Sequence, residues 1–183
     1  NGLRPGGFTG MGEKMDVAGY QECLETVLED IEYDKPCEPS GSPTKIRAKG
    51  IAAGWKSPSM PTNAGSAAII RMNEDGTFFL MSSGMEIGQG AATVLPQIAA
   101  EVLSVSPDKI TFCSGDTDHT PYEWQTVASR TTYCAGNAVK LAAEDLVDKV
   151  LELAQIKMGA VKRDLKFEDG YVVHKIYPER RVP

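Results

Sequence analysis

The segment SSGMEIGQGAATVLPQIAAEVL, residues 82–103, places three glycines and a glutamine in front of an apolar, alanine-rich run. The run predicts a helix over 91–104. Glycine loses more backbone entropy on folding than any other residue, so Gly84, Gly88 and Gly90 need a structural reason. A close approach of the backbone to a ligand, or to another segment of the chain, would provide that reason.

Further helices and short strands are predicted on both sides of this segment. Apolar residues recur at helical spacing over 16–32 and 133–158, which predicts two more helices. Apolar runs bounded by turn residues predict strands at 45–55, 66–72, 77–81, 110–114 and in a hairpin over 165–175. The order is helix, three strands, helix, strand, helix, two strands. It predicts an α+β fold, in which a mixed β-sheet has its helices packed on one side.

A loop rich in Pro, Ser, Gly and Asp over 33–44 is the predicted boundary within the chain. It separates an N-terminal helix and linker, 1–44, from one α+β domain over 45–183. The chain starts without Met, and both of its ends have the composition of loops. We therefore expect this segment to be part of a longer polypeptide.

Composition narrows the classes of function. The 183 residues carry a formal net charge of −6, which argues against nucleic acid or an anionic membrane as the main partner. No apolar run reaches the roughly 18 residues of a membrane span, and no signal peptide is visible. The four cysteines lie far apart and only two histidines are present, so neither a zinc site nor a disulfide framework is predicted. These features predict a cytoplasmic protein with reduced thiols.

Two loops lead into predicted helices, and both have the composition of an anion site. The first loop is GMEIGQG, 84–90, and the second loop is TVASRTT, 126–132. Free N–H groups at a helix start favour anions, and the hydroxyls of Ser129, Thr131 and Thr132 can donate to a phosphate or cap the helix. Taken singly, each loop is better explained by a structural role, because short glycine motifs match by chance. The spacing fits neither a Rossmann G-x-G-x-x-G nor a P-loop.

Several separated motifs follow one another in a characteristic order. They are Gly84 with Glu86–Gly90, LSVSP at 103–107, Asp116-Thr117 with Thr120-Pro121, Ser129–Thr132, and Gly136–Val139. Together they resemble the large molybdenum-cofactor subunit of the xanthine dehydrogenase and aldehyde oxidase family. Several separated motifs in this order are far more specific than either loop alone. The resemblance is strongest from about Lys49 to Ala143 and covers essentially the whole chain.

The resemblance implies that the 45–183 domain binds molybdopterin and that the full-length protein is a molybdenum-dependent oxidoreductase. In this family the dithiolene of the molybdopterin holds the molybdenum, so no protein side chain is expected as a metal ligand. The residues implied to contact the cofactor are Gly88, Gln89 and Gly90 of the first loop, and Ala128, Ser129, Arg130 and Thr131 of the second loop. The glycines would let main-chain N–H groups approach a bulky anion. In many bacterial relatives the cofactor is the cytosine dinucleotide form.

The family hydroxylates small-molecule substrates with water as the oxygen source, and a glutamate in a G-x-G-E-like stretch is its catalytic base. No such stretch occurs here, so no catalytic residue is assigned and the isolated segment is expected to be inactive. Glu86 is expected to be structural. The partners implied are the remaining parts of the molybdenum subunit, together with iron–sulfur and flavin (FAD) parts on other domains or subunits.

Two other functions stay open from the residues alone. One is a nucleotide-binding hydrolase or transferase that uses Glu86, Glu101 or Asp116, although the missing phosphate-loop pattern argues against it. The other is a non-catalytic interaction domain, which the loop-like ends of the chain favour. Molybdenum and an organic pterin in the full-length protein would distinguish the family interpretation from both.

Overall fold

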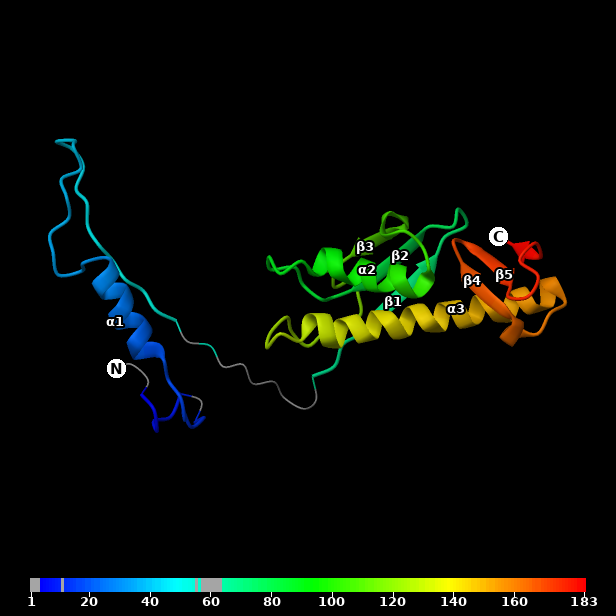
Figure 1. Ribbon diagram of the computed structural model, residues 1–183, viewed down its shortest axis with the longest axis horizontal. Helices are drawn as coiled ribbons and strands as arrows, with labels where there is room; N and C mark the ends of the chain where they lie inside the picture. The colour runs from blue at the N-terminus through cyan, green and yellow to red at the C-terminus, as the bar shows by residue number, and fades with distance from the viewer. Residues whose placement is uncertain (1–3, 11, 55, 57–63) are drawn as a thin grey trace. The chain divides into compact units, whose positions relative to one another are not determined.

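The computed structural model describes residues 4–10, 12–54, 56 and 64–183, and the chain divides into two units, 1–56 and 57–183. Figure 1 shows the helices and strands of each unit. The domain boundary at residue 44 stays a prediction. Both loops that lead into helices lie in the second unit.

The first unit contains one helix, α1, Tyr20–Asp30, which is shorter than the predicted 16–32 and has no buried residue. The strand predicted over 45–55 is wrong for residues 45–54, which form no strand, and Trp55 lies outside the described residues. The alternating pattern of this segment favours an extended chain, but a strand also needs a hydrogen-bonded neighbour. Instead, the Lys49 ammonium holds the segment to the loop that follows α1, by donating to the carbonyl oxygen of Lys35 at 2.9 Å.

A mixed three-stranded sheet forms the centre of the second unit. Strands β1, Ala68–Met72, and β2, Phe78–Ser82, form an antiparallel hairpin, and β3, Ile110–Cys113, pairs with β2 in parallel. The hairpin turns at Gly76, whose φ is +79°, as the Asp-Gly pair predicts. Strand β2 is central and buries every second residue, Phe78, Leu80 and Ser82, completely.

Two helices cover the same face of this sheet. Helix α2, Ala91–Leu103, connects β2 to β3, and helix α3, Gly136–Met158, follows the π-helical turn η2, Thr131–Ala135. Their apolar side chains join Phe78 and Leu80 of β2 in one core; the buried helix residues are Leu95, Ala99, Ala100, Leu103, Val139 and Ala143. The predicted α+β class and the one-sided packing of these helices are confirmed.

The predicted terminal hairpin belongs to a second sheet, separate from the mixed sheet. Strands β4, Leu165–Glu168, β5, Tyr171–His174, and β6, Arg181–Val182, pair antiparallel and pack on the C-terminal half of α3, as Figure 1 shows. The 23 residues of α3 make it about 35 Å long, so one helix supports both sheets. Short 3-10 turns, η1 at Pro107–Lys109 and η3 at Lys162–Asp164, precede β3 and β4.

Within the described part of the chain, no helix is both long and apolar enough to cross a membrane. The cysteines Cys23, Cys37, Cys113 and Cys134 are all free thiols.

Candidate functional site

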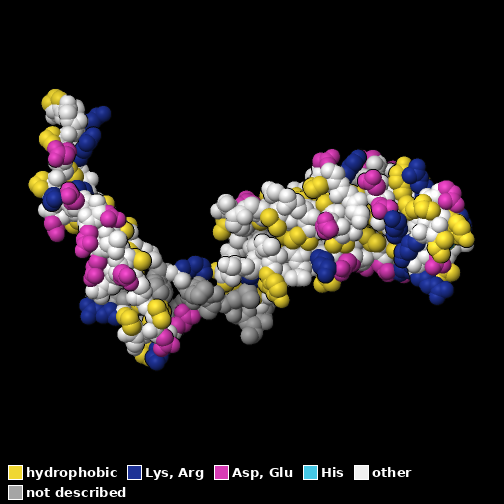
Figure 2. Space-filling view, in the orientation of Figure 1, with side chains coloured by type: hydrophobic (Ala, Val, Ile, Leu, Met, Phe, Trp, Pro, Cys, Tyr) yellow, Lys and Arg dark blue, Asp and Glu magenta, His cyan; other side chains and the backbone are white. Residues whose placement is uncertain are grey.

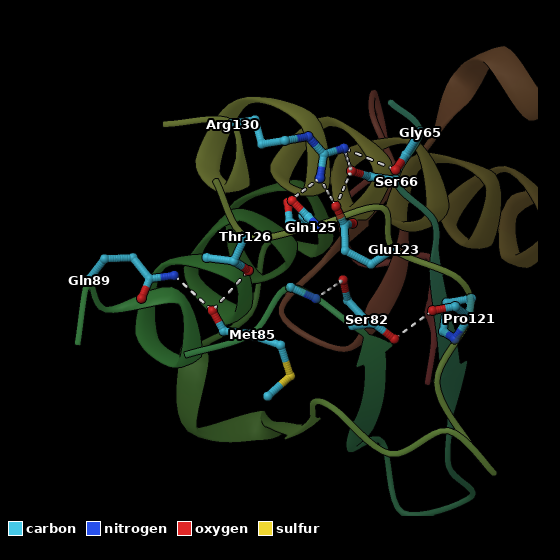
Figure 3. Close-up of polar contacts among 12 residues, drawn as sticks. Gly65, Ser66, Ser82, Met85, Gln89, Pro121, Glu123, Gln125, Thr126 and Arg130 are labelled. Carbon is cyan, nitrogen blue, oxygen red and sulfur yellow. Dashed lines mark hydrogen bonds and ion pairs between the residues drawn. The ribbon is translucent and has the colours of Figure 1, made fainter. Parts of the chain in front are cut away.

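The first and second loops meet at one edge of the mixed sheet. Each lies between a strand of the parallel β2–β3 pair and a helix, and the carboxyl ends of parallel strands share an edge. The carbonyl oxygen of Met85 accepts a hydrogen bond from Gln89 Nε2 at 2.8 Å and another from Thr126 Oγ1 at 3.2 Å (Figure 3). Two segments about 40 residues apart in sequence are therefore joined through one main-chain atom.

Gly84 allows a close approach between chain segments. A Cβ at this position would lie 3.2 Å from Leu95 Cδ1, 3.4 Å from Thr131 Cγ2 and 3.5 Å from Ala135 Cβ. Any larger side chain would push the first loop away from α2 and η2. This glycine therefore serves packing between the two loops, which is one of the two reasons expected from the sequence.

Glu86 caps the start of α2. Its carboxylate accepts hydrogen bonds from the N–H groups of Gly88 at 2.7 Å, Gly90 at 3.0 Å and Ala92 at 2.9 Å. The bond from Ala92, followed by that from Gly90, lowers the pKa of Glu86 below its usual value. These amides are arranged to hold an oxyanion, and in this structure the oxyanion is the protein's own carboxylate.

Gly88 and Gly90 are needed for their backbone conformation. Their φ angles are +100° and +85°, and a Cβ at either position would meet no described atom within 4 Å. Residues other than glycine rarely adopt such φ angles. Because the N–H groups of both residues already donate to Glu86, a ligand must share or replace that carboxylate to reach them.

The Gln89 side chain closes the first loop on itself and remains exposed. Its Oε1 accepts the Ile87 N–H at 2.7 Å while its Nε2 donates to Met85. A primary amide has two N–H donors and two lone pairs, so half of its hydrogen-bonding capacity is still available to a ligand.

The second loop contains two consecutive non-glycine residues in the left-handed region. Ala128 has φ +52° and Ser129 has φ +55°. Such residues carry local strain and are concentrated at functional sites. Among the described residues, neither N–H group has an acceptor, and the Ser129 side chain is exposed. The loop therefore presents two main-chain donors and a hydroxyl.

The side chains of Arg130 and Thr131 point into the domain. Arg130 is 2% exposed, and its guanidinium donates to the Glu123 carboxylate and to the Gln125 carbonyl oxygen at 2.6 Å (Figure 3). It also donates to the Gly65 carbonyl oxygen at 2.9 Å and to Ser66 Oγ at 2.8 Å. Thr131 is also buried. The structure thus brings Gly88, Gln89, Gly90, Ala128 and Ser129 to accessible loops, and it places these two side chains behind them.

The sequence interpretation missed Glu123 and Thr126. Thr126 lies within the second loop but gave no motif signal of its own. For Glu123, the available signal was an acid seven residues before Arg130 that stands between two aromatic residues, Tyr122 and Trp124. Such a position is typical of a buried ion-pair partner. The Trp124 ring lies 5.8 Å from the Arg130 guanidinium carbon and completes this enclosure.

Few cationic side chains lie in the stretch of sequence that contains the two loops. Between residues 82 and 132 only Lys109 and Arg130 are cationic, and Figure 2 shows Lys and Arg gathered instead over the β4–β6 end of the second unit. An anion at these loops must therefore be held by main-chain N–H groups, hydroxyls and amides. Within the described residues, no group of three or more His, Cys, Asp or Glu side chains could hold a metal ion.

The chain matches the molybdopterin cofactor-binding domain over residues 26–183. Over 153 residues, 84% of this chain, it is 36% identical to the probable hypoxanthine oxidase XdhD of Escherichia coli K12. Over 174 residues, 92% of this chain, it is 33% identical to the putative xanthine dehydrogenase molybdenum-binding subunit XdhA of the same strain. The chain spans 16% and 23% of the lengths of these two relatives.

The fold agrees with that match. The crystal structure of quinoline 2-oxidoreductase from Pseudomonas putida 86 superimposes with a TM-score of 0.62 at 31% identity, over 67% of this chain and 16% of that chain. A Cu,Mo-CO dehydrogenase gives a TM-score of 0.61 at 29% identity, over 65% of this chain and 15% of that chain. These matches favour the family interpretation over the hydrolase and interaction-domain alternatives. The chain belongs to the molybdopterin cofactor-binding domain family of xanthine dehydrogenase-like proteins.

Proposed function

We propose that this chain is the part of a molybdenum-dependent oxidoreductase that holds the molybdopterin through the first and second loops. The observation that carries the proposal is the junction at the Met85 carbonyl oxygen. It sets an exposed glutamine amide beside a loop in which the N–H groups of Ala128 and Ser129 have no acceptor among the described residues.

The donor set fits a pterin that carries phosphate. The N–H groups of Ala128 and Ser129 and the Ser129 hydroxyl would donate to anionic or carbonyl oxygens. The Gln89 amide, which both donates and accepts, suits the edge of a heterocycle. Gly88 and Gly90 would hold the first loop in shape and admit close approach, and Arg130 and Thr131 would take part through the main chain of the second loop.

When bound, the cofactor would supply the molybdenum centre at which a small-molecule substrate is oxidised. The residues of this chain would bind and orient it. None is assigned as the catalytic base, so the isolated segment is expected to be inactive. We also propose that the cofactor is the cytosine dinucleotide form, that the substrates resemble those of aldehyde oxidases, and that the protein is cytoplasmic.

Iron–sulfur and flavin groups would lie on other domains or subunits. The names of two relatives from Paenarthrobacter nicotinovorans, the 6-hydroxypseudooxynicotine dehydrogenase complex subunit gamma and the nicotine 6-hydroxylase large subunit, describe parts of larger assemblies. We propose a similar assembly for the protein that contains this chain.

The test is molybdenum and pterin content in the full-length protein that contains this chain, made in a molybdenum-replete host. Gly88→Val would force a branched side chain into φ +100° and block backbone approach, so we expect loading to be abolished. Gly170→Val is the matched control, because Gly170 has φ +79° and equally open surroundings but lies in the β4–β5 turn. Full loading of Gly88→Val would contradict the proposal.

A further inference from the structure

A buried ion pair lies directly behind the second loop. The side chains of Glu123 and Arg130 are 4% and 1% exposed, and together they enclose residues 124–129. Glu123 is also tied to the neighbouring segment: it forms an isolated antiparallel bridge with Ser66, and the Trp124 N–H donates to the Gly65 carbonyl oxygen at 3.2 Å. Both ends of the loop are therefore fixed to the body of the domain.

The pair is an expensive way to obtain stability. Within the described residues, Glu123 Oε2 and Arg130 Nε have no hydrogen-bond partner although both atoms are buried. Desolvation of a buried ion pair commonly offsets its attraction, and apolar replacements are often as stable. The best-attested use of such pairs is to specify one conformation over others.

The conformation that the ion pair could specify is the left-handed backbone of Ala128 and Ser129. Non-glycine residues avoid this region unless the surrounding structure imposes it. The Arg130 N–H donates to the Val127 carbonyl oxygen at 3.1 Å, so the tight turn ends at the residue whose guanidinium is locked inside. Fixing Glu123 and Arg130 thus closes the loop from both sides.

We propose that Glu123 and Arg130 are positioning residues that hold Ala128 and Ser129 in the left-handed conformation and so preorganise the second loop for the cofactor. The inference rests on the proposed function. The pair would set the conformation of the loop. A ligand that needs one loop conformation loses apparent affinity when a smaller fraction of the molecules has that conformation.

The test replaces the whole pair in the full-length protein, as Glu123→Leu with Arg130→Met. The unfolding midpoint should fall less than in Arg130→Ala, because no charge is left buried without its partner, although the carbonyl oxygens of Gly65 and Gln125 lose a donor. If the loop is competent about a tenth of the time, loading at limiting molybdate falls about tenfold. Hydrogen exchange in cofactor-free protein should accelerate at the Trp124 and Arg130 amides, which donate to Gly65 and Val127 in the folded loop, and this gives a readout independent of cofactor.

Glycine rescue distinguishes positioning from general stability. Ala128→Gly with Ser129→Gly should restore most of the loading in the double variant, because glycine adopts positive φ readily. Ser104→Gly and Asp169→Gly are matched controls: their φ angles are +49° and +56°, they lie outside the loop, and they should restore none. Wild-type loading and exchange in the double variant, or loss of loading that glycine does not rescue, would overturn the inference.

A conservative variant protects the test against misfolding. Arg130→Lys keeps the charge but cannot serve four acceptors with a planar fork, so loading should fall between those of the wild type and the double variant. Unchanged loading in Arg130→Lys would also count against the inference. The proposed function fails separately, if the wild type carries no molybdenum or if Gly88→Val loads fully.

Discussion

The first and second loops reach the same place by different means. The first loop is held by bonds within itself: Glu86 and Gln89 bond to atoms no more than six residues away. The second loop is held from outside, by an arginine that reaches residues 64 and 65 positions earlier in the chain. Local restraint forms with the loop, whereas the second loop acquires its shape only when the domain has folded.

Breaking the outside restraint should give the largest stability effect. Arg130→Ala leaves the Glu123 carboxylate buried without its partner, and we expect a loss of about 3–5 kcal/mol in the free energy of unfolding. The measurement is denaturant unfolding. Lys149→Ala removes an exposed pair with Asp145, 66% and 64% exposed, and should cost less than about 0.5 kcal/mol. Equal losses for the two variants would show that the buried pair has no special role.

Breaking the junction from the first loop should affect loading more than folding. Gln89→Ala removes the donor to the exposed Met85 carbonyl oxygen and any bond to the cofactor, and we expect a cost of about 0.5–1.5 kcal/mol in cofactor affinity. The measurement is molybdenum content across a range of molybdate concentrations, with the unfolding midpoint taken alongside. Gln97→Ala, on the α2 surface, is the control. A large fall in the unfolding midpoint with normal molybdenum loading would show that Gln89 stabilises the fold and does not contact the cofactor.

The local restraint of the first loop, the Glu86 cap, should depend on pH. The folded-state pKa of Glu86 is lowered from 4.5, so the stability from its cap is fully present above pH 4.5 and is lost as pH falls through the folded value. Glu86→Gln should therefore be less stable than wild type near pH 7 and converge with it in acid. Parallel stability curves down to pH 3 would show that the carboxylate charge does not hold the loop.

The smallest effect is expected at the exposed hydroxyl of the second loop. Ser129→Ala removes one donor, while the main-chain N–H groups of Ala128 and Ser129 remain. Loading should fall by less than in Gln89→Ala, with no measurable change in stability. Loading below that of Gln89→Ala would make the hydroxyl the principal contact of the second loop.

Sequence periodicity predicted the elements whose formation depends on a local apolar pattern. The helices expected over 91–104 and 133–158 appear as Ala91–Leu103 and Gly136–Met158, because apolar spacing reports the buried face of each. The start of the last helix differs, since residues 131–135 form a π-helical turn that no pattern announced. The strand predicted over 45–55 is wrong for residues 45–54, because pairing requires a neighbouring strand that the segment itself does not encode.

The candidate site also contains features that local sequence predicts and features that only the tertiary fold decides. The sequence could place the glycines and the glutamine of the first loop in a turn before α2, because their bonds are local, whereas their contact with the cofactor stays a prediction. The roles of Arg130 and Glu123 could not, since their contacts with Gly65 and Ser66 depend on where β1 starts relative to the second loop. A residue type indicates what it can bond to, while only the fold decides whether that partner is a ligand or another segment.

The acceptor that joins the two loops is a main-chain carbonyl, so it has no amino-acid identity. Any residue at position 85 presents the same oxygen, and sequence drift there leaves the junction intact. Only its two donors, Gln89 and Thr126, are visible to selection. A side-chain mutagenesis scan would therefore attribute the coupling to Gln89 and Thr126, and would pass over the main-chain oxygen that both of them bond to.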